Sequence, residues 1–351
     1  MRFYDQPHKF YCGVDLHARS MYLCIRTSDG AIVLHQNFVA DAKTFLEAVA
    51  PFRDGLVVGC ECMFAWYWLA DLCAEHQIPF VLGHALYFKA IHGGKSKNDK
   101  LDADKLCALL RGGNFPMAYV YPKGLRETRD LLRRRNGFVR QRALLVAHVQ
   151  NTNSQYNLPA FGKKLVSPAN REELDVAERF VDPSVRLSIE TDLALIDQYD
   201  ERIAELELYL VRHAKIDDAN VFHRLRSIPG VGKILALVLL YEIHDIGRFP
   251  SVGAFLSYCR LVRPKHESAG KSKGAAKGAK KIGNGHLRWA FGEAICLWLR
   301  ESDRAKAWMK RREKKSGKAK AMGILAAKLA RATYHLLRKK DTFDETKALG
   351  G

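Results

Sequence analysis

Four carboxylates in the first third of the chain have the types and the placing to hold a divalent metal ion against a phosphate. Asp15 lies in the apolar run GVDLH and Glu61 in the apolar run GCECM, where an unpaired carboxylate is costly. Asp99 and Asp102 are three residues apart, so they share one face of a helix, whereas Asp104 points elsewhere. Carboxylate oxygens are the ligands that Mg²⁺ prefers. We therefore predict that Asp15, Glu61, Asp99 and Asp102 bind Mg²⁺, for which Mn²⁺ can substitute.

A less specific interpretation of these acids stays open. Lone acids at a strand end or on a helix are usually surface residues, and the stretch 95–106 alternates in charge like a solvated helix. Asp99 stands where this helix is expected to begin, so it can serve there simply as an N-cap. The joint pattern of four acids favours the metal site.

Two serines, Ser268 and Ser272, lie among lysines, glycines and alanines in the stretch 265–285. This composition predicts a flexible basic loop that follows a phosphate backbone. A serine here becomes a nucleophile toward a DNA phosphate only if its neighbours activate it, and Lys265 and Lys271 are placed to offset phosphate charge. The string AGKS is not a phosphate-binding P-loop, because that motif needs glycine where the chain has Lys265.

Two further segments are predicted to contact phosphates. The PGVG turn of 229–232 joins two expected helices, as in a helix-hairpin-helix element, where glycines let backbone N–H groups approach a phosphate. The alternative is an ordinary turn between helices. The run 304–320 is strongly basic. The residues predicted for these contacts are Gly230, Gly232, Lys233, Lys310, Arg311 and Arg312.

The overall charge indicates a polyanionic partner. The 351 residues include 57 Lys and Arg against 38 Asp and Glu, for a formal net charge of +19, which favours nucleic acid first and an anionic membrane second. The longest apolar runs, such as 234–243, are too short to span a bilayer, and the N-terminus has no secretory apolar region. The eight cysteines lack zinc-ligand spacing. We expect a cytoplasmic, nucleoid-associated prokaryotic protein.

The N-terminal part has the pattern of an α/β domain. The expected order is β-β-β-α-β-α-β-α, with the SDG turn joining the second and third strands as a hairpin. Strands are predicted at 10–17, 21–28, 31–38, 56–63 and 78–83, and helices at 42–53, 65–76 and 98–113. In the ribonuclease H topology the first and fourth strands are neighbours and the last helix packs alongside, which would bring the four carboxylates together.

The rest of the chain is predicted to be mainly helical. Apolar residues recur at spacings of three, four or seven in 125–156 and 187–213, which predicts a helical hairpin or coiled coil whose leucines pack within the chain or form a dimer seam. Between them, 157–186 is expected to be a loop with short helical pieces. Helices are also expected on both sides of the PGVG turn, at 286–300 and at 321–340.

These motifs together resemble a known family. The order GVDLH, CE and ND-x-x-DA, then SIPGVGKILALVLLYEIHDIGRF, FLSYCRLVRPKHESAGKS and GNGHLRW, is similar to that of the transposases of the insertion sequence 110 family. The resemblance covers nearly the whole chain. It implies a RuvC-like (ribonuclease H fold) DEDD domain at 1–120, a helical coiled-coil insertion at 121–215 and a C-terminal transposase domain at 216–345 that carries a catalytic serine.

The resemblance also implies an activity. Family members act as RNA-guided DNA recombinases, so the expected partners are donor and target DNA, a guide RNA of the bridge type encoded by the element, and further copies of the chain in a dimer or tetramer. Asp15, Glu61, Asp99 and Asp102 match the acidic tetrad. At the position where family members have a sequence similar to HSSGG, this chain has HESAG. Ser268 is therefore the expected nucleophile, and Ser272 is the alternative.

Two other functions remain open from the sequence. A Holliday-junction resolvase or ribonuclease H-like nuclease would use the same acids with water as the nucleophile, and would leave no covalent protein–DNA adduct. A nucleic-acid-binding protein without activity would cleave no strand in Mg²⁺ or Mn²⁺.

Overall fold

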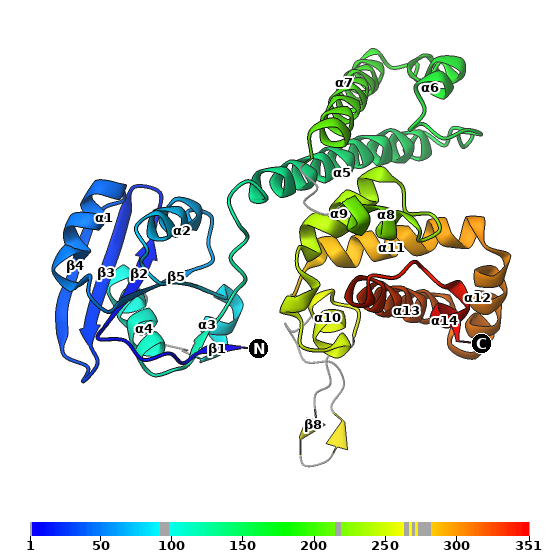
Figure 1. Cartoon of the computed structure of the whole chain (residues 1–351). Coiled ribbons are helices and arrows are strands. Elements are labelled where there is room, and N and C mark those ends of the chain that lie inside the picture. The colour runs from blue at the N-terminus through cyan, green and yellow to red at the C-terminus, as the bar shows by residue number, and fades with distance from the viewer. Residues whose placement is uncertain are drawn as a thin grey trace. The chain divides into compact units, whose positions relative to one another are not determined.

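The computed structural model describes residues 2–91, 98–214, 219–262, 267–268, 271–272 and 282–350. The chain divides into two compact units, Met1–Lys123 and Gly124–Gly351, and each is described by itself. The first unit is mixed α/β and the second is helical apart from one short strand pair (Figure 1). Within the described ranges, no helix combines the length and the apolar character needed to cross a membrane.

A five-stranded sheet in the order β4-β3-β2-β5-β6 organises the first unit. Strands β2, β3 and β4 are antiparallel neighbours, whereas β5 and β6 run parallel to β2. Their bounds are Phe10–Leu16 for β2, Ser20–Thr27 for β3, Ile32–Val39 for β4, Leu56–Glu61 for β5 and Phe80–Gly83 for β6. The five predicted strands are confirmed, and so is the prediction that the first and fourth of them are neighbours.

Helices cover both faces of this sheet. Helices α1 (Ala42–Val49) and α2 (Trp66–Glu75) pack on the face that carries Cys12, Val14 and Leu16 of β2. Helix α4 (Asp99–Arg111) packs on the opposite face, against Tyr11 and its neighbours. Because successive strand residues point to opposite faces, the odd-numbered residues of β2 face α4. The predicted helix 42–53 is confirmed and ends in a short 3-10 turn, η1 (Ala50–Phe52). The sequence analysis did not predict α3 (Ala85–Ile91) or the pair β1 (Phe3–Tyr4) and β7 (Phe115–Pro116).

Helix α4 begins at a well-formed cap. The side chain of Asn98 accepts a hydrogen bond from the Leu101 N–H at 2.8 Å, which satisfies one of the free N–H groups of the first turn. The alternative that Asp99 serves as the N-cap is therefore wrong. Asp99 and Asp102 lie in the first turn, where negative charge is favoured by the helix dipole.

A glycine lets this helix lie directly on the sheet. A Cβ atom at Gly13 of β2 would stand 2.4 Å from the carbonyl oxygen of Ala103 and 2.4 Å from the backbone nitrogen of Cys107. These are backbone atoms of a helix and cannot move aside as a flexible side chain does. Any other residue at position 13 would therefore push α4 away from β2.

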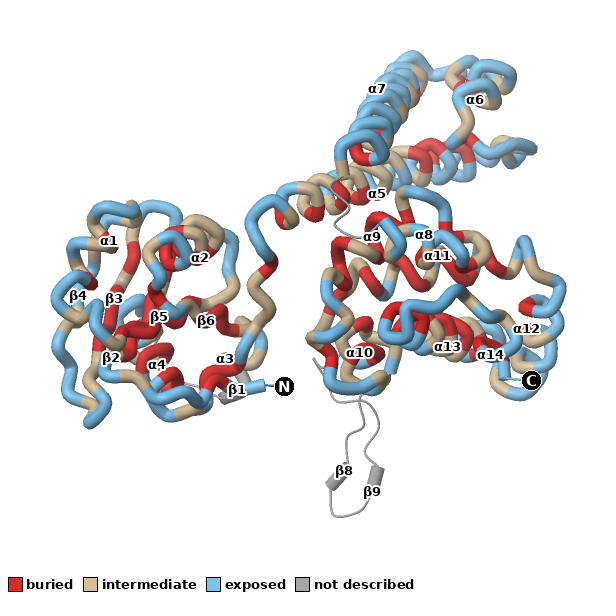
Figure 2. Tube along the Cα trace, viewed as in Figure 1, coloured by how far each residue is buried: buried red, intermediate tan, exposed pale blue. Residues whose placement is uncertain are grey.

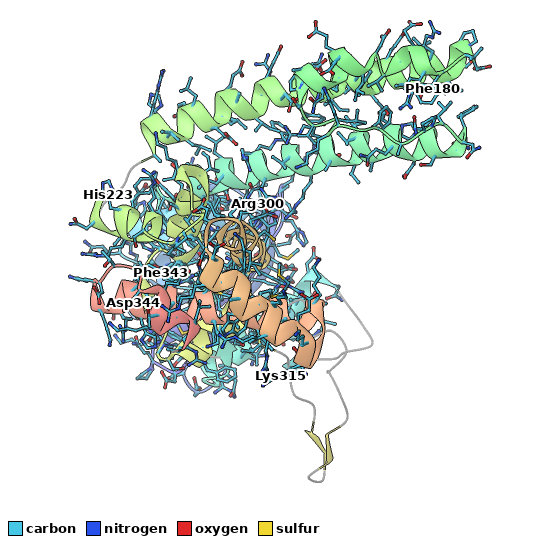
Figure 3. All side chains as sticks on the ribbon, turned by 90° about the vertical axis from the view of Figure 1, so that its right-hand side faces the viewer. Phe180, His223, Arg300, Lys315, Phe343 and Asp344 are labelled. Atoms are coloured by element: carbon cyan, nitrogen blue, oxygen red, sulfur yellow. The ribbon has the colours of Figure 1, made fainter. Side chains whose placement is uncertain are left out.

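The second unit begins with a long helical hairpin. Helix α5 (Arg126–Gln155) packs against α7 (Pro183–His213), as predicted, and the connection contains α6 (Pro168–Leu174) and η2 (Ala177–Arg179). The buried residues of α7 recur every seven positions, at Ile189, Ile196, Ile203 and Leu210. These side chains pack within the chain, which is one of the two alternatives for this pattern. At the tip of the hairpin, Phe180 packs edge-on against Tyr156 (Figure 3).

The remaining helices form a bundle around α9 (Lys233–Ile243), which is buried over most of its length (Figure 2). Helix α11 (Gly285–Glu301) and helix α13 (Lys318–Lys339) contribute many of the buried residues of this bundle. The other elements are α8 (Ala219–Arg226), η3 (Ile246–Arg248), α10 (Val252–Tyr258), α12 (Asp303–Ser316), α14 (Glu345–Leu349) and the strands β8 (Glu267–Ser268) and β9 (Lys271–Ser272). The basic run of the sequence forms α12, a helix that the sequence analysis did not predict.

Glu242 joins the hairpin to the bundle through buried charges. Its carboxylate, 3% exposed, accepts hydrogen bonds from Arg133 Nε at 2.6 Å, Arg129 Nε at 3.1 Å and Asn284 Nδ2 at 2.7 Å. Burial raises the pKa of Glu242, but the hydrogen bond from Arg133 and the charges of Arg129 and Arg133 outweigh it and lower that pKa from 4.5 to about 2. Glu242 therefore stays charged under nearly all conditions.

This network makes the second unit sensitive to acid. Because the pKa of Glu242 is lower in the folded than in the unfolded chain, its stabilisation is complete above about pH 4.5 and disappears as the pH falls toward 2, a loss of about 3 kcal/mol. Glu242→Gln leaves two arginines without a buried counter-charge, so it should cost roughly 3–5 kcal/mol at neutral pH and flatten the pH dependence. Thermal unfolding followed by circular dichroism between pH 7 and 2.5 measures both effects.

The matched control is Asp303→Asn, which removes an exposed acid that pairs with Lys306 on α12. This variant should unfold in acid much as the unmodified chain does. An unchanged pH dependence in Glu242→Gln would contradict the role assigned to the network.

Candidate active site

Asp15 and Glu61 lie at the same edge of the sheet. Strands β2 and β5 are parallel, and their register pairs Gly13 with Gly59 and Val14 with Cys60. Asp15 and Glu61 are the next residues of the two strands. Both have the parity of the glycines that face α4, so both side chains start on the α4 side of the sheet. Parallel pairing thus places the backbones of two predicted ligands next to each other. Among the described residues, the compact group of ligand atoms contains Asp15 and Asp99 but neither Glu61 nor Asp102.

Helix α4 brings further acids to Asp15. The imidazole Nε2 of His17 lies 3.5 Å from Asp15 Oδ2 and 3.5 Å from Asp99 Oδ1, and the ligand atoms of the three residues lie within 4.8 Å of one another. Asp102, one turn further along α4, is close enough for its charge to act on Asp15. It also accepts a hydrogen bond from Lys105 Nζ at 3.2 Å.

The electrostatics of Asp15 are those of a carboxylate that lacks sufficient positive charge nearby. Burial raises its pKa, His17 lowers it, and the charges of Asp99 and Asp102 raise it further. A divalent cation among these oxygens would remove the repulsion, and carboxylates are suitable ligands for Mg²⁺ or Mn²⁺. The residues present therefore fit a divalent metal ion.

Asp104 is placed with other partners. Its carboxylate accepts hydrogen bonds from Arg26 Nη2 at 2.6 Å and Arg26 Nε at 3.1 Å, on strand β3. The thiol of Cys24 is 3.5 Å away from the same oxygen. Asp104 therefore points off the face shared by Asp99 and Asp102, as predicted.

His17 is a site residue that the sequence analysis missed. It follows directly after β2, and its backbone N–H donates to the Ser20 carbonyl at 2.9 Å in the turn toward β3. The signal in the sequence was its position two residues after Asp15, which gives both side chains the same direction. A histidine at such a place is common, and only the neighbouring carboxylates distinguish it.

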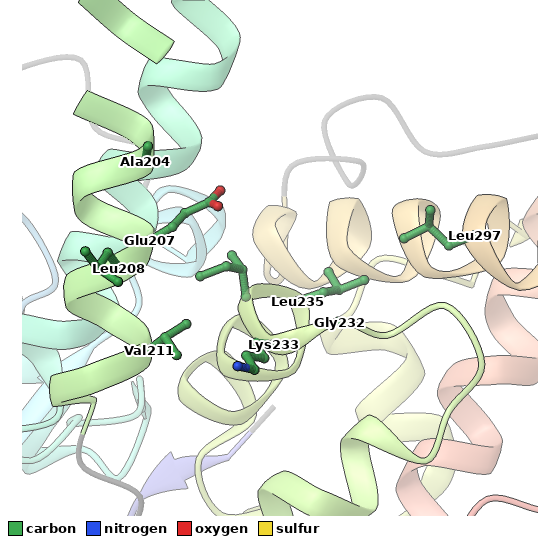
Figure 4. Close-up of a pocket in the computed structure, with 9 residues that line it drawn as sticks. Ala204, Glu207, Leu208, Val211, Gly232, Lys233, Leu235 and Leu297 are labelled. Atoms are coloured by element: carbon green, nitrogen blue, oxygen red, sulfur yellow. The ribbon is translucent and has the colours of Figure 1, made fainter. Parts of the chain in front are cut away.

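The PGVG turn is held by packing. The Gly230 N–H donates to Glu301 Oε2 at 2.8 Å, and a Cβ atom at Gly230 would come within 2.5–2.8 Å of Leu297 and Trp298 on α11. The Gly230 N–H, which we predicted to contact a phosphate, thus donates its hydrogen bond to the Glu301 carboxylate in this structure. Gly232 and Lys233 line a groove between α7 and α9, together with side chains of α7 such as Glu207 and Leu208 (Figure 4).

The segment around the serines is tied at both ends. The Asn284 N–H donates to the Tyr258 carbonyl at 2.5 Å, and Arg260 donates to the Gly283 carbonyl through Nε at 2.9 Å. The Asn284 side chain also caps α11 and contacts Glu242. The end of α10 and the start of α11 are therefore joined by hydrogen bonds.

Between these ends, Ser268 of β8 pairs with Lys271 of β9, and Glu267 pairs with Ser272. Lys265 and the side chains of Ser268 and Lys271 lie outside the described residues, so their predicted roles stay predictions.

Helix α12 presents most of its basic residues to solvent. Lys310 and Arg311 are exposed, and so are Lys314 and Lys315 in the last turn; Figure 3 labels Lys315. Arg312 is half-buried, and its Nε lacks a hydrogen-bond partner among the described residues. The exposed residues are placed to meet an anion, whereas Arg312 is less accessible.

Comparison with known proteins connects both units to one group of enzymes. The family model described as Transposase IS116/IS110/IS902 family matches residues 222–320, and a transposase model for the DEDD domain of the IS110 group matches residues 12–157. The matched ranges contain all four carboxylates, the PGVG turn, Ser268 and the whole of the basic helix α12.

Full-length relatives extend the similarity over nearly the whole chain. The transposase for insertion sequence element IS1111A of Coxiella burnetii is 25% identical over 343 residues, which cover 94% of this chain and 90% of that protein. The transposase for insertion sequence element IS1328 of Yersinia enterocolitica is 23% identical over 97% of this chain and all of that protein. The putative transposase y4qE of Sinorhizobium fredii is 29% identical over 59% of this chain.

The geometry of the acids predicts different effects for two neighbouring aspartates. Asp102→Asn keeps the shape of the side chain and removes a charge near Asp15, so Mg²⁺ or Mn²⁺ should bind roughly 10-fold more weakly or worse. Asp104→Asn is the matched control, because Asp104 contacts Arg26 and should leave the metal affinity nearly unchanged. Calorimetric titration with each metal gives the comparison. An equal loss of metal affinity in both variants would mean that Asp102 has no specific role in binding the metal.

Proposed function

The chain belongs to the IS116/IS110/IS902 family of transposases. We propose that it recombines DNA under the guidance of an RNA, and that it uses a serine nucleophile and a set of metal-binding carboxylates to cut the strands. Asp15, Glu61, Asp99 and Asp102 act as the metal-binding tetrad in a RuvC-like domain, and Ser268 attacks the DNA. The proposal is carried by the proximity of Asp15 and Asp99: each has a carboxylate oxygen 3.5 Å from His17 Nε2. The two aspartates belong to separate elements of a transposase domain, so the fold brings them together.

The reaction conserves the energy of the broken bond. The Ser268 oxygen forms a bond to the scissile phosphorus while the bond from phosphorus to the 3′-oxygen breaks, and the hydroxyl proton ends on the departing 3′-oxygen. The resulting 5′-phosphoserine can be attacked by a 3′-hydroxyl in the reverse sense, so rejoining needs no ATP. This agrees with the failure of AGKS as a P-loop motif.

Each group has a stated task in this scheme. A divalent metal, when bound, stabilises charge that develops on the scissile phosphate and favours deprotonation of the attacking hydroxyl. Lys265 and Lys271 offset phosphate charge next to Ser268. The hydrogen bonds of Arg260 and Asn284 hold the ends of the serine segment.

The nucleic-acid partners follow from the charge and from the family. A formal net charge of +19 supports binding of nucleic acid in general. We propose that these nucleic acids are donor DNA, target DNA and a guide RNA of the bridge type, which the resemblance to the family implies. Gly232 and Lys233 at the start of α9, together with α12, supply candidate phosphate contacts. Cutting several strands requires several active serines, so we propose that the chain acts as a dimer or tetramer.

Salt dependence tests the contribution of α12. Replacing Lys310, Arg311 and Lys314 by Gln should weaken DNA binding about equally for all sequences. It should also lower the slope of log affinity against log salt concentration by roughly 1 for each phosphate that the helix no longer neutralises. The control replaces Lys43, Arg202 and Lys347 by Gln, which removes the same charge from exposed residues that pair with acids. An equal change in both variants would mean that α12 acts only through net charge.

Covalent trapping tests the serine. Ser268→Ala should bind RNA and DNA but lose both the protein–DNA adduct and recombination, whereas the control Ser272→Ala should retain both. The reaction is stalled on a nicked DNA substrate, the protein is digested, and the modified peptide is identified by mass spectrometry. Modification at Ser272 would assign the reaction to the other serine. Cleaved DNA with free ends and no adduct would show hydrolysis, as in a resolvase or ribonuclease H-like nuclease.

A further inference from the structure

We propose that His17 is a ligand of the divalent metal through Nε2, so that the site combines nitrogen with oxygen ligands. The inference rests on the metal site of the proposed function and adds to it a residue outside the acidic tetrad. It is carried by the position of His17 between Asp15 and Asp99.

The three ligand atoms have the spacing that a single ion requires. Nε2 lies 3.5 Å from each of the two carboxylate oxygens, which are themselves within 4.8 Å of each other. Three atoms so arranged share a point that lies no more than about 2.4 Å from each of them, close to the ~2.0–2.2 Å of metal bonds to nitrogen and oxygen. An ion at this point reaches all three without a change of fold.

The surroundings favour a ligand over a chance surface pair. The ring nitrogen lies equally far, 3.5 Å, from one oxygen of each carboxylate, and this exceeds the ~2.7–3.2 Å of a well-formed hydrogen bond, so His17 is shared between Asp15 and Asp99. The backbone of His17 is held by its hydrogen bond to Ser20, whereas its side chain is 50% exposed and accessible to ions. Asp15, 17% exposed, forms the inner side of the same cluster.

A nitrogen ligand has a consequence for metal choice. Magnesium prefers oxygen ligands, whereas imidazole binds transition-metal ions well. Replacing His17 should therefore weaken Mn²⁺ binding more than Mg²⁺ binding. Loss of a mere outer-shell partner costs roughly 10- to 100-fold in metal affinity, so loss of a ligand should weaken Mn²⁺ binding by at least about 10-fold.

The experiment uses Mn²⁺ as the probe with the full-length, tag-free chain. Electron spin echo spectroscopy of the Mn²⁺-loaded protein should detect coupling to a ¹⁴N nucleus, and calorimetry gives the affinities for Mn²⁺ and Mg²⁺. In His17→Gln, which keeps a polar group of similar reach, the coupling should vanish. The matched control is His76→Gln, at the end of α2, in which the coupling should persist. Circular dichroism verifies that both variants are folded.

The outcomes separate the role of His17 from the metal site itself. Mn²⁺ that binds to the unmodified chain and to His17→Gln with the same affinity and without ¹⁴N coupling would overturn the inference and leave the carboxylate site intact. Coupling that persists in His17→Gln would also overturn it. If Asp15→Asn binds Mn²⁺ as tightly as the unmodified chain, the proposed metal site fails as well.

Discussion

The contact between Gly13 and helix α4 is the constraint on which the candidate active site depends. The backbone of α4 lies so close to β2 that a Cβ atom at position 13 would overlap the Ala103 carbonyl and the Cys107 amide. Asp15 follows Gly13 by two residues, and Asp99 precedes Ala103 by about one helical turn. Because the two backbones touch at this point, the carboxylates beyond it are brought within reach of the same ion.

The sheet and the helix thereby force like charges together. Packing of α4 on β2 brings the negative charges of Asp99 and Asp102 to Asp15. Folding works against this repulsion, which raises the pKa of Asp15 together with its burial. Asp104, only two residues from Asp102, instead finds Arg26 and forms an ordinary ion pair. The difference between the two aspartates is the helical face on which each lies, and it separates a candidate ligand from a structural acid.

The second unit uses buried charge for a different purpose. Glu242 connects α9 to the α5–α7 hairpin through Arg129 and Arg133, and to the start of α11 through Asn284. Asn284 in turn binds the end of α10, so one hydrogen-bonded network links the hairpin to both ends of the segment that contains Ser268. The same few polar groups therefore stabilise both the packing of the hairpin on the bundle and the ends of the serine segment, because loss of one partner leaves a buried charge uncompensated.

Local periodicity was enough to predict most of the helices and strands. Apolar runs and alternation predicted the five strands of the sheet, and the seven-residue spacing of Ile189, Ile196 and Ile203 predicted the hairpin, because these patterns are properties of neighbouring residues. Helix α12 was not predicted because only two of its residues, Ala305 and Met309, are buried. Two apolar positions in a strongly charged run do not give a recognisable helical pattern. The short strands β1 and β7 were not predicted because a two-residue strand has no periodicity of its own and is defined by its hydrogen bonds to its partner.

Which groups meet is a property of the folded chain alone. Asp104 pairs with Arg26, 78 residues away in the sequence, and the Gly230 amide pairs with Glu301, 71 residues away. The local sequence pattern therefore could not predict either contact. His17 likewise becomes notable only when α4 brings Asp99 to it. The cause is the same in each case: spacing along the chain fixes the direction of a side chain, whereas its charge environment depends on backbones that pack together from distant parts of the sequence.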